Sequence, residues 1–201
     1  MSAARHLYLA SRSLRRRELL KQIGVGFELL LLREAAGRPP DVDESVHTGE
    51  DPIAYVQRLA REKGEIAWLR LCQRRLMRHP VLAADTTVEL NGEILGKPAD
   101  REDAVSMLKR LSGSTHRVHT AISIVLDRHV ETALSSTTVV FGELNEDEIQ
   151  QYVASGDPMD KAGAYGIQGR AGAFVKSLSG SYTGVVGLPL YETDQLLRRF
   201  A

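Results

Sequence analysis

Residues 80–98, PVLAADTTVELNGEILGKP, decide the fold class of this chain. The apolar run at 80–84 predicts a buried strand that ends at Asp85-Thr86-Thr87. Residues 88–95 predict a β-hairpin, because Asn91-Gly92 is the strongest short signal for a two-residue hairpin turn. We therefore expect antiparallel pairing in this part of the sheet.

The apolar patterning extends outward in both directions. It predicts strands at 7–10, 27–32, 115–126, 130–141 and 173–178. It predicts helices at 14–23, 52–77, 101–111, 146–154 and 190–200. Residues 34–51 and 156–172 are expected to be loops. Since hairpins and crossovers both occur, the class is α/β with a mixed sheet.

Length and composition limit the class of protein. The chain has 201 residues, 43% hydrophobic and 26% charged, which predicts one folded domain. Its 26 basic and 26 acidic residues cancel, which argues against stable binding of nucleic acid. Apolar runs such as that at 29–32 are far shorter than the roughly 20 residues of a membrane span.

Cys72 is the single cysteine, so an internal disulfide and a multi-cysteine zinc site are excluded. This is typical of a reducing compartment, and without a signal peptide we expect a cytoplasmic protein. We expect Cys72 itself to be buried and unreactive. His116 and His119 lie in a predicted strand, where their odd spacing places them on opposite faces, so they form a poor metal pair.

The first candidate site is the start of the first helix, where Arg15, Arg16 and Arg17 follow the predicted N-cap Ser13. The helix dipole disfavours positive charge there by about a few tenths of a kcal/mol per residue. Backbone N–H groups and guanidinium groups together bind phosphate well, so this segment is a candidate anion site. The alternative interpretation is a solvated basic face.

The second candidate is Asp85 with Lys97. A carboxylate at the exit of a buried strand lies where open α/β sheets place their ligands, and it can hold a metal or accept a proton from water. The predicted hairpin would return Lys97 over the same cleft. The alternative is a turn-forming aspartate and a surface lysine.

Two further segments are weaker candidates. Residues 160–169 form a glycine-rich stretch with an embedded acid–base pair, which suits a loop that approaches a ligand closely. A flexible surface loop is its alternative. Glu44 lies in an acidic group and Lys63 on the next helix, although acidic residues on a loop are usually solvated.

The combination of these blocks resembles the Maf family of nucleoside triphosphate pyrophosphatases. The blocks occur in family order over nearly the whole chain, and that at 160–169 is highly specific. The matching segments are Leu9-Ala10-Ser11, Arg15-Arg16, Glu18-Leu19-Leu20, Asp43-Glu44, Ala84-Asp85-Thr86, Ile94-Leu95-Gly96-Lys97-Pro98, Leu111-Ser112-Gly113 and 160–169.

The resemblance implies a single catalytic domain of the Maf type over residues 1–201. It implies a mixed twisted β-sheet in two lobes around a central cleft, like that of inosine triphosphatases. It also implies hydrolysis of a nucleoside triphosphate between the α- and β-phosphates, a divalent cation such as Mg²⁺ or Mn²⁺, and a homodimer.

Residue roles carry over from the family motifs. Asp85 matches the proton acceptor and, with Glu44, a metal ligand. Positions linked to substrate preference match Arg15, Thr86 and Gln168. Cleft positions around phosphates, metal or base match Ser11, Arg16, Glu44, Lys63, Lys97, Asp160 and Lys161.

The chain departs from the family pattern at several places. Leu14 replaces a frequent proline, with little expected effect. Gly64 stands where alanine is usual, at an expected cost of up to about 1 kcal/mol. Residues 34–40 and 70–79 look longer than usual, which would reshape the cleft rim or the dimer contact.

The segment Ala164-Tyr165-Gly166-Ile167-Gln168 resembles the subgroup that prefers dTTP and UTP. We therefore expect a pyrophosphatase acting on these nucleotides or on modified pyrimidine nucleotides. Two alternatives remain open: the same chemistry on 7-methyl-GTP, and a nucleotide-binding regulator of cell division with little turnover.

Overall fold

Strand β3 (Val81–Leu90) lies at the centre of a seven-stranded mixed sheet, whose strand order is β2-β1-β3-β5-β6-β7 with β4 paired to β3. The computed structural model describes residues 6–33 and 39–200. The other strands are β1 (His6–Leu9), β2 (Gly26–Leu29), β4 (Glu93–Leu95), β5 (Thr115–Leu126), β6 (His129–Phe141) and β7 (Val175–Ser179). The sheet is parallel at β2-β1-β3 and antiparallel elsewhere, which confirms the predicted fold class.

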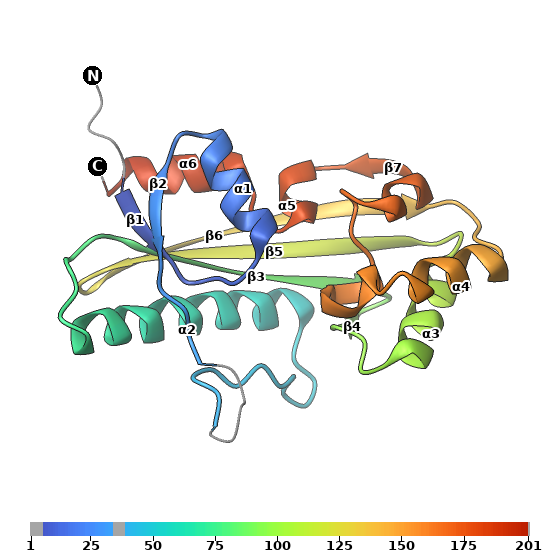
Figure 1. Cartoon of the computed structure of the whole chain (residues 1–201), viewed down its shortest axis with the longest axis horizontal. Helices are drawn as coiled ribbons and strands as arrows, with labels where there is room; N and C mark the ends of the chain where they lie inside the picture. Colours follow the sequence, from blue (N-terminus) through green and yellow to red (C-terminus); the bar gives the residue numbers. More distant parts are fainter. Residues whose placement is uncertain (1–5, 34–38, 201) are drawn as a thin grey trace.

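Helices cover both faces of the sheet (Figure 1). The long helix α2 (Pro52–Gln73) packs on β3 and β5 from one side. On the other side lie α1 (Leu14–Gln22), α5 (Tyr182–Val186) and α6 (Leu190–Arg198). Helices α3 (Arg101–Leu111) and α4 (Glu146–Ala154) pack together at the far end of the β5–β6 hairpin.

The buried apolar side chains form separate clusters at the two ends of the sheet. One cluster joins α3 and α4 to β3, β5 and β6, and includes Leu108, Phe141 and Tyr152. Another joins α1 and α6 to β1 and β3, and includes Leu20 and Leu82. The β5–β6 hairpin runs through both, so the molecule consists of two halves that share one sheet (Figure 1).

On one edge of β3, the middle of the strand has no partner strand among the described residues. β1 pairs with β3 only at Val81 and Leu82, and β4 pairs only from Val88 to Leu90. In the part of the chain that the structure describes, no strand pairs with residues 83–87 on this edge, while β5 pairs with them on the other. The gap lies between the two halves.

The structure corrects the prediction that the strand ends at Asp85-Thr86-Thr87. β3 continues to Leu90, because β5 pairs with it as far as Glu89 opposite Arg117. Asp85 therefore lies in mid-strand. It is accessible because of the gap in the β3 edge, and not because the strand ends there.

Other elements differ in extent from their predictions. Strand β2 ends at Leu29, because its partner β1 ends at Leu9. Helix α2 ends at Gln73, since Arg75 has a φ of 52° and cannot continue a helix. The segment 156–172, expected as loop, contains the short 3₁₀ helices Asp157–Asp160 and Ala162–Ala164, and a third, Arg170–Phe174, extends into the strand predicted at 173–178. Strand β7 consequently begins at Val175.

One expectation about a single residue was wrong, and one helix had not been predicted. Cys72 is exposed, because it lies on the outer side of α2 beside the buried Leu71. Helix α5 was not predicted, since Gly184 and β-branched residues favour helices weakly. The expected insertion at 34–40 falls mostly outside the described residues.

Gly64 is required by packing, which the sequence did not indicate. A Cβ atom at this position of α2 would lie 3.0 Å from Ser123 Oγ and 3.0 Å from Val125 Cγ2, both on β5. These distances are shorter than ordinary van der Waals contacts. The absence of a side chain at Gly64 thus lets α2 pack close to β5 beside the cleft.

We predict that Gly64→Ala lowers the free energy of unfolding by about 1–2 kcal/mol, because overpacking outweighs the gain of about 1 kcal/mol in helix propensity. Urea unfolding followed by circular dichroism measures it. Ser123→Ala is the matched control. Ser123 Oγ is buried without a hydrogen-bond partner among the described residues, so its removal should cost little and should restore part of the stability of Gly64→Ala, since the contact with Val125 remains. A Gly64→Ala protein more stable than the unaltered chain would contradict this account.

Candidate functional site

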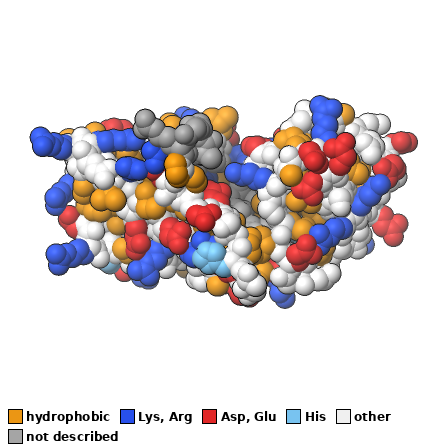
Figure 2. Space-filling model, turned by 90° about the horizontal axis from the view of Figure 1, so that it is seen from below, with side chains coloured by type: hydrophobic (Ala, Val, Ile, Leu, Met, Phe, Trp, Pro, Cys, Tyr) orange, Lys and Arg blue, Asp and Glu red, His pale blue; other side chains and the backbone are white. Residues whose placement is uncertain are grey.

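A cleft of about 1040 Å³ lies along the unpaired edge of β3, between the two halves of the molecule. The outline of the space-filling view dips between these halves (Figure 2). Arg17 of the first candidate site does not line this cleft, whereas all the residues with a role carried over from the family motifs do: Ser11, Arg15, Arg16, Glu44, Lys63, Asp85, Thr86, Lys97, Asp160, Lys161 and Gln168.

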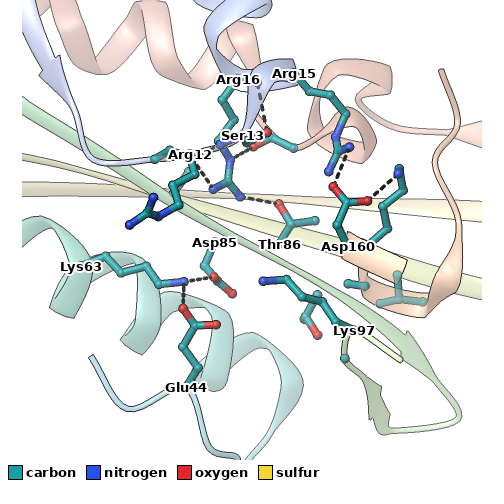
Figure 3. A pocket seen from close by; sticks show the side chains of 18 of the residues that line it. Arg12, Ser13, Arg15, Arg16, Glu44, Lys63, Asp85, Thr86, Lys97 and Asp160 are labelled. Carbon is teal, nitrogen blue, oxygen red and sulfur yellow. Dashed lines mark hydrogen bonds and ion pairs between the residues drawn. The ribbon is translucent and has the colours of Figure 1, made fainter. Parts of the chain in front are cut away.

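Lys63 joins two carboxylates at the centre of the cleft (Figure 3). Its Nζ lies 2.6 Å from Asp85 Oδ1 and 2.8 Å from Glu44 Oε1. The Lys63 and Asp85 side chains are only 14% and 12% exposed, whereas Glu44 is 51% exposed. The weak acidic cluster of the sequence analysis is therefore part of the site through Glu44.

These contacts set the charge states of the group. Burial alone would lower the pKa of Lys63, but the charges of Asp85 and Glu44 raise it, so the amine stays protonated. Burial would raise the pKa of Glu44, but the charge and hydrogen bond of Lys63 lower it. The cleft thus holds an ionised carboxylate beside a fixed ammonium group.

Residues outside the predicted set hold Glu44 in place. Tyr55 Oη donates a hydrogen bond of 3.0 Å to the Glu44 carbonyl. Arg58 donates a hydrogen bond of 3.0 Å to the Ser45 carbonyl. It also forms a bidentate ion pair with Glu50, at 2.7 and 2.8 Å. The sequence signal that could have revealed them is their position on the first turns of α2, directly after the acidic loop.

Arg16 fastens the start of α1 to two other segments. Its guanidinium donates to the Gly187 carbonyl at 2.7 Å, to Ser11 Oγ at 3.2 Å and to Thr86 Oγ1 at 3.1 Å. Ser13 caps the helix, as predicted, by accepting from the Arg16 N–H. The positive charge at this helix start is therefore offset by polar contacts, although Arg16 has no carboxylate partner among the described residues.

Arg15 reaches across the cleft. Its Nη1 lies 3.6 Å from Asp160 Oδ2, which comes from the opposite half of the molecule (Figure 3). Both side chains keep solvent exposure, 31% for Arg15 and 69% for Asp160. This contact is weak enough to be exchanged for a ligand anion.

Lys161 is directed back into its own loop. Its Nζ contacts Asp160 Oδ1 at 2.6 Å, Asp157 Oδ1 at 3.0 Å and the Asp157 carbonyl. Asp157, which sequence reasoning missed, also accepts from Tyr152 Oη at 2.8 Å. A Cβ at Gly166 would lie 2.6 Å from Lys161 Cε, so glycine is needed where the loop covers the lysine.

Lys97 and Gln168 complete the cleft, and neither is held by a hydrogen bond or ion pair to another described residue. Lys97 extends into it between Asp85 and Asp160 (Figure 3) and forms no ion pair with the described residues. The hairpin bearing Lys97 is tied to the glycine-rich loop by a 3.0 Å hydrogen bond from Gly163 N to the Gly96 carbonyl. Gln168 is exposed at the cleft and is available to a ligand.

The charge of the cleft differs from that of the chain. Seven basic and three acidic side chains line it, although basic and acidic residues balance over the whole chain. Two of the basic residues, Arg33 and Lys161, pair with Asp41 and Asp157 behind the lining, which still leaves a positive excess. Such a cleft attracts a polyanion.

The described residues contain no cluster of three or more His, Cys, Asp and Glu able to hold a metal by themselves. His116 and His119 are both buried in separate contacts, with Tyr165 and with Ser136 and Glu89, which agrees with their rejection as a pair. Glu44 and Asp85 remain as one pair of carboxylates. This number suits Mg²⁺, which binds proteins through one or two carboxylates and completes its shell with phosphate oxygens and water.

Comparison with known proteins gives a consistent result. The family model described as "Maf-like protein" matches residues 6–200. A protein of Dechloromonas aromatica (strain RCB) named dTTP/UTP pyrophosphatase is 56% identical over 193 residues, which cover 96% of each chain. One of the same name from Nitrosomonas europaea is 56% identical, covering 95% of this chain and 92% of that protein.

A third relative, from Aromatoleum aromaticum, has the same name and is 55% identical over 96% of this chain and 95% of its own. Among the helices of the described residues, none is long and apolar enough to cross a membrane.

We predict that Arg16→Ala lowers the free energy of unfolding by about 2–3 kcal/mol, since three hydrogen bonds to buried or half-buried acceptors are lost. Arg15→Ala should change it by less than about 0.5 kcal/mol, because its ion pair is long and exposed. Urea unfolding compares the two, and titration with inorganic tripolyphosphate should show weaker binding for Arg15→Ala. An Arg15→Ala protein that lost several kcal/mol and kept its affinity for tripolyphosphate would make Arg15 a structural residue.

Proposed function

The chain belongs to the Maf family, and from this premise we propose that it is a pyrophosphatase that hydrolyses dTTP and UTP to the nucleoside monophosphate and pyrophosphate. The enzyme class is that of nucleoside triphosphate pyrophosphatases, hydrolases that act on acid anhydrides. The observation that carries the proposal is the Asp85–Lys63–Glu44 group inside a cleft with an excess of basic side chains. A triphosphate is a polyanion of the kind that this cleft attracts.

Asp85 is the proposed proton acceptor. Lys63 holds its Oδ1 at 2.6 Å, which leaves Oδ2 to accept the proton of the attacking water. Because the Asp85 side chain is only 12% exposed, few orientations are open to it. The carboxylate is thereby positioned before the substrate arrives.

The basic residues are proposed to bind the triphosphate and to stabilise the charge that develops during hydrolysis. Arg15 and Lys97 extend into the cleft from opposite halves of the molecule. Arg16 has guanidinium N–H groups beyond the three it uses, and these can bind a phosphate oxygen. Lys161 is proposed to act mainly by holding Asp160 and the loop at 161–169.

Glu44 and Asp85 are the residues that would hold a divalent cation, Mg²⁺ or Mn²⁺. Such a cation neutralises phosphate charge and orients the water when it is bound. Lys63 keeps both carboxylates close together despite their like charge, so the pair is available as a ligand set.

Thr86 and Gln168 are proposed to determine which base is accepted. Gln168 offers an amide that can donate to a carbonyl of uracil or thymine. An exposed side chain at the cleft can adjust to the base without breaking contacts within the protein.

We further propose a cytoplasmic homodimer that does not bind nucleic acid stably. The balance of basic and acidic residues supports the last point. The exposed thiol of Cys72 suits a reducing compartment. Leu69 near the end of α2 is 54% exposed, and Met77 after the end of that helix is 71% exposed, which gives apolar surface that a second subunit could cover.

We predict that Asp85→Asn lowers kcat at least about 10²-fold, because the amide keeps the size of the side chain but cannot accept the proton. Pyrophosphate release from UTP in the presence of Mg²⁺ measures it. Circular dichroism and the Tm serve as the control for folding. Near-normal kcat in a folded Asp85→Asn protein would remove Asp85 from its role.

A panel of nucleotides tests which base the protein prefers. We predict that kcat/KM for dTTP and UTP exceeds that for CTP, with GTP and 7-methyl-GTP lower still. A bound base that buries Gln168 and leaves its amide unpaired loses about 1–3 kcal/mol, or roughly five- to 150-fold in binding. The differences in kcat/KM between these nucleotides should be smaller in Gln168→Ala. Faster cleavage of 7-methyl-GTP than of UTP would overturn the dTTP/UTP assignment, and binding of all nucleotides without turnover would favour a regulatory role.

A further inference from the structure

A chain of hydrogen bonds runs from the cleft into the interior of the protein through Thr86 and Thr120. Arg16 Nη2 donates to Thr86 Oγ1 at 3.1 Å. Thr86 Oγ1 lies 2.9 Å from Thr120 Oγ1, the residue directly opposite on β5. Thr120 Oγ1 in turn donates to the Gly184 carbonyl of α5 at 2.8 Å. Thr120 is fully buried and does not line the cleft.

The direction of every bond in this chain is fixed by its two ends. A guanidinium can only donate and a carbonyl can only accept. Thr120 has a single hydroxyl proton, which goes to Gly184, so Thr86 must be the donor in the bond between the two threonines. The proton of Thr86 is therefore directed inward, away from the cleft.

Thr86 consequently presents only an acceptor to a ligand. Of the two lone pairs on its oxygen, Arg16 occupies one, and the other remains free. Thr86 lines the cleft and is only partly buried, so a ligand can reach it. A ligand atom that meets Thr86 must carry a hydrogen, because two acceptors facing each other leave one unpaired.

Glycine at 184 makes this arrangement possible. A Cβ there would lie 3.0 Å from Ser135 Oγ and 3.2 Å from Ser181 Cβ, so a side chain would push α5 away from the sheet. The carbonyl of Gly184 would then move out of reach of Thr120. The backbone of α5 thus serves as the fixed acceptor that polarises the chain.

We propose that Thr120 is a positioning residue that orients the Thr86 hydroxyl as an obligate acceptor for the N3–H of uracil or thymine. This inference rests on the proposed function and on the assignment of Thr86 to substrate preference. Uracil and thymine both carry a hydrogen on N3, whereas cytosine has a lone pair there. The polarised chain therefore favours UTP and dTTP over CTP.

Thr120→Val tests the proposal, because valine keeps the shape of threonine and removes the hydroxyl. The Thr86 proton then loses its acceptor and is free to turn toward the cleft, where it can meet N3 of cytosine. We expect the UTP to CTP ratio of kcat/KM to narrow on the order of five- to tenfold. Thr120→Ser, which keeps the hydroxyl, should restore the ratio.

Thr137→Val is the matched control. Thr137 Oγ1 also ties α5 to the sheet, by accepting from Ser181 N at 2.9 Å and donating to the Ser181 carbonyl at 3.2 Å, but it does not contact Thr86. Its removal loosens α5 without freeing the Thr86 proton. The UTP to CTP ratio should therefore stay at the value of the unaltered protein, while the Tm of both valine variants falls.

Three results would overturn the inference. The first is an unchanged ratio in a folded Thr120→Val protein, or in Thr120→Ala if the valine variant does not fold. The second is an equal narrowing in Thr137→Val. The third is the absence of pyrophosphate release from UTP by the unaltered protein, which would also remove the proposed function. If the unaltered protein releases pyrophosphate and the UTP to CTP ratio of kcat/KM is the same in Thr120→Val, only the role of Thr120 is removed.

Discussion

The unpaired edge of β3 at residues 83–87 is the constraint on which the site depends. β1 is too short to pair beyond Leu82, and β4 begins to pair only at Val88. Neighbouring side chains on a strand point to opposite faces, so at this open edge Asp85 meets α2 through Lys63 and Thr86 meets α1 through Arg16. Both faces of the sheet thus contribute to one cleft.

Charge placement gives this cleft its chemical character. A chain without net charge gathers basic side chains around two carboxylates, and one lysine joins the carboxylates directly. The cleft spans two halves that share the β5–β6 hairpin but have separate apolar clusters. Because Arg15 and Asp160 contact each other from opposite halves, a bound polyanion would replace a contact that already crosses the cleft.

Much of this arrangement was predictable from the sequence, and the failures have physical causes. The Asn91-Gly92 hairpin, helix α3 and the β5–β6 hairpin followed from local patterning. Each residue carried over from the family motifs lines the cleft. The mid-strand position of Asp85 could not be predicted, since pairing with β5 depends on residues more than thirty positions away. Thr120 was missed for the same reason, because its two hydrogen-bond partners, Thr86 and Gly184, lie in segments far from it in the sequence.

Identification of the products by ³¹P NMR tests the central claim most directly. With UTP, Mg²⁺ and the unaltered protein, the account predicts that UMP and pyrophosphate appear in equal amounts and that UDP does not accumulate. Formation of UDP and inorganic phosphate would contradict it, because the cleft would then cleave the terminal phosphate and not the bond between the α- and β-phosphates.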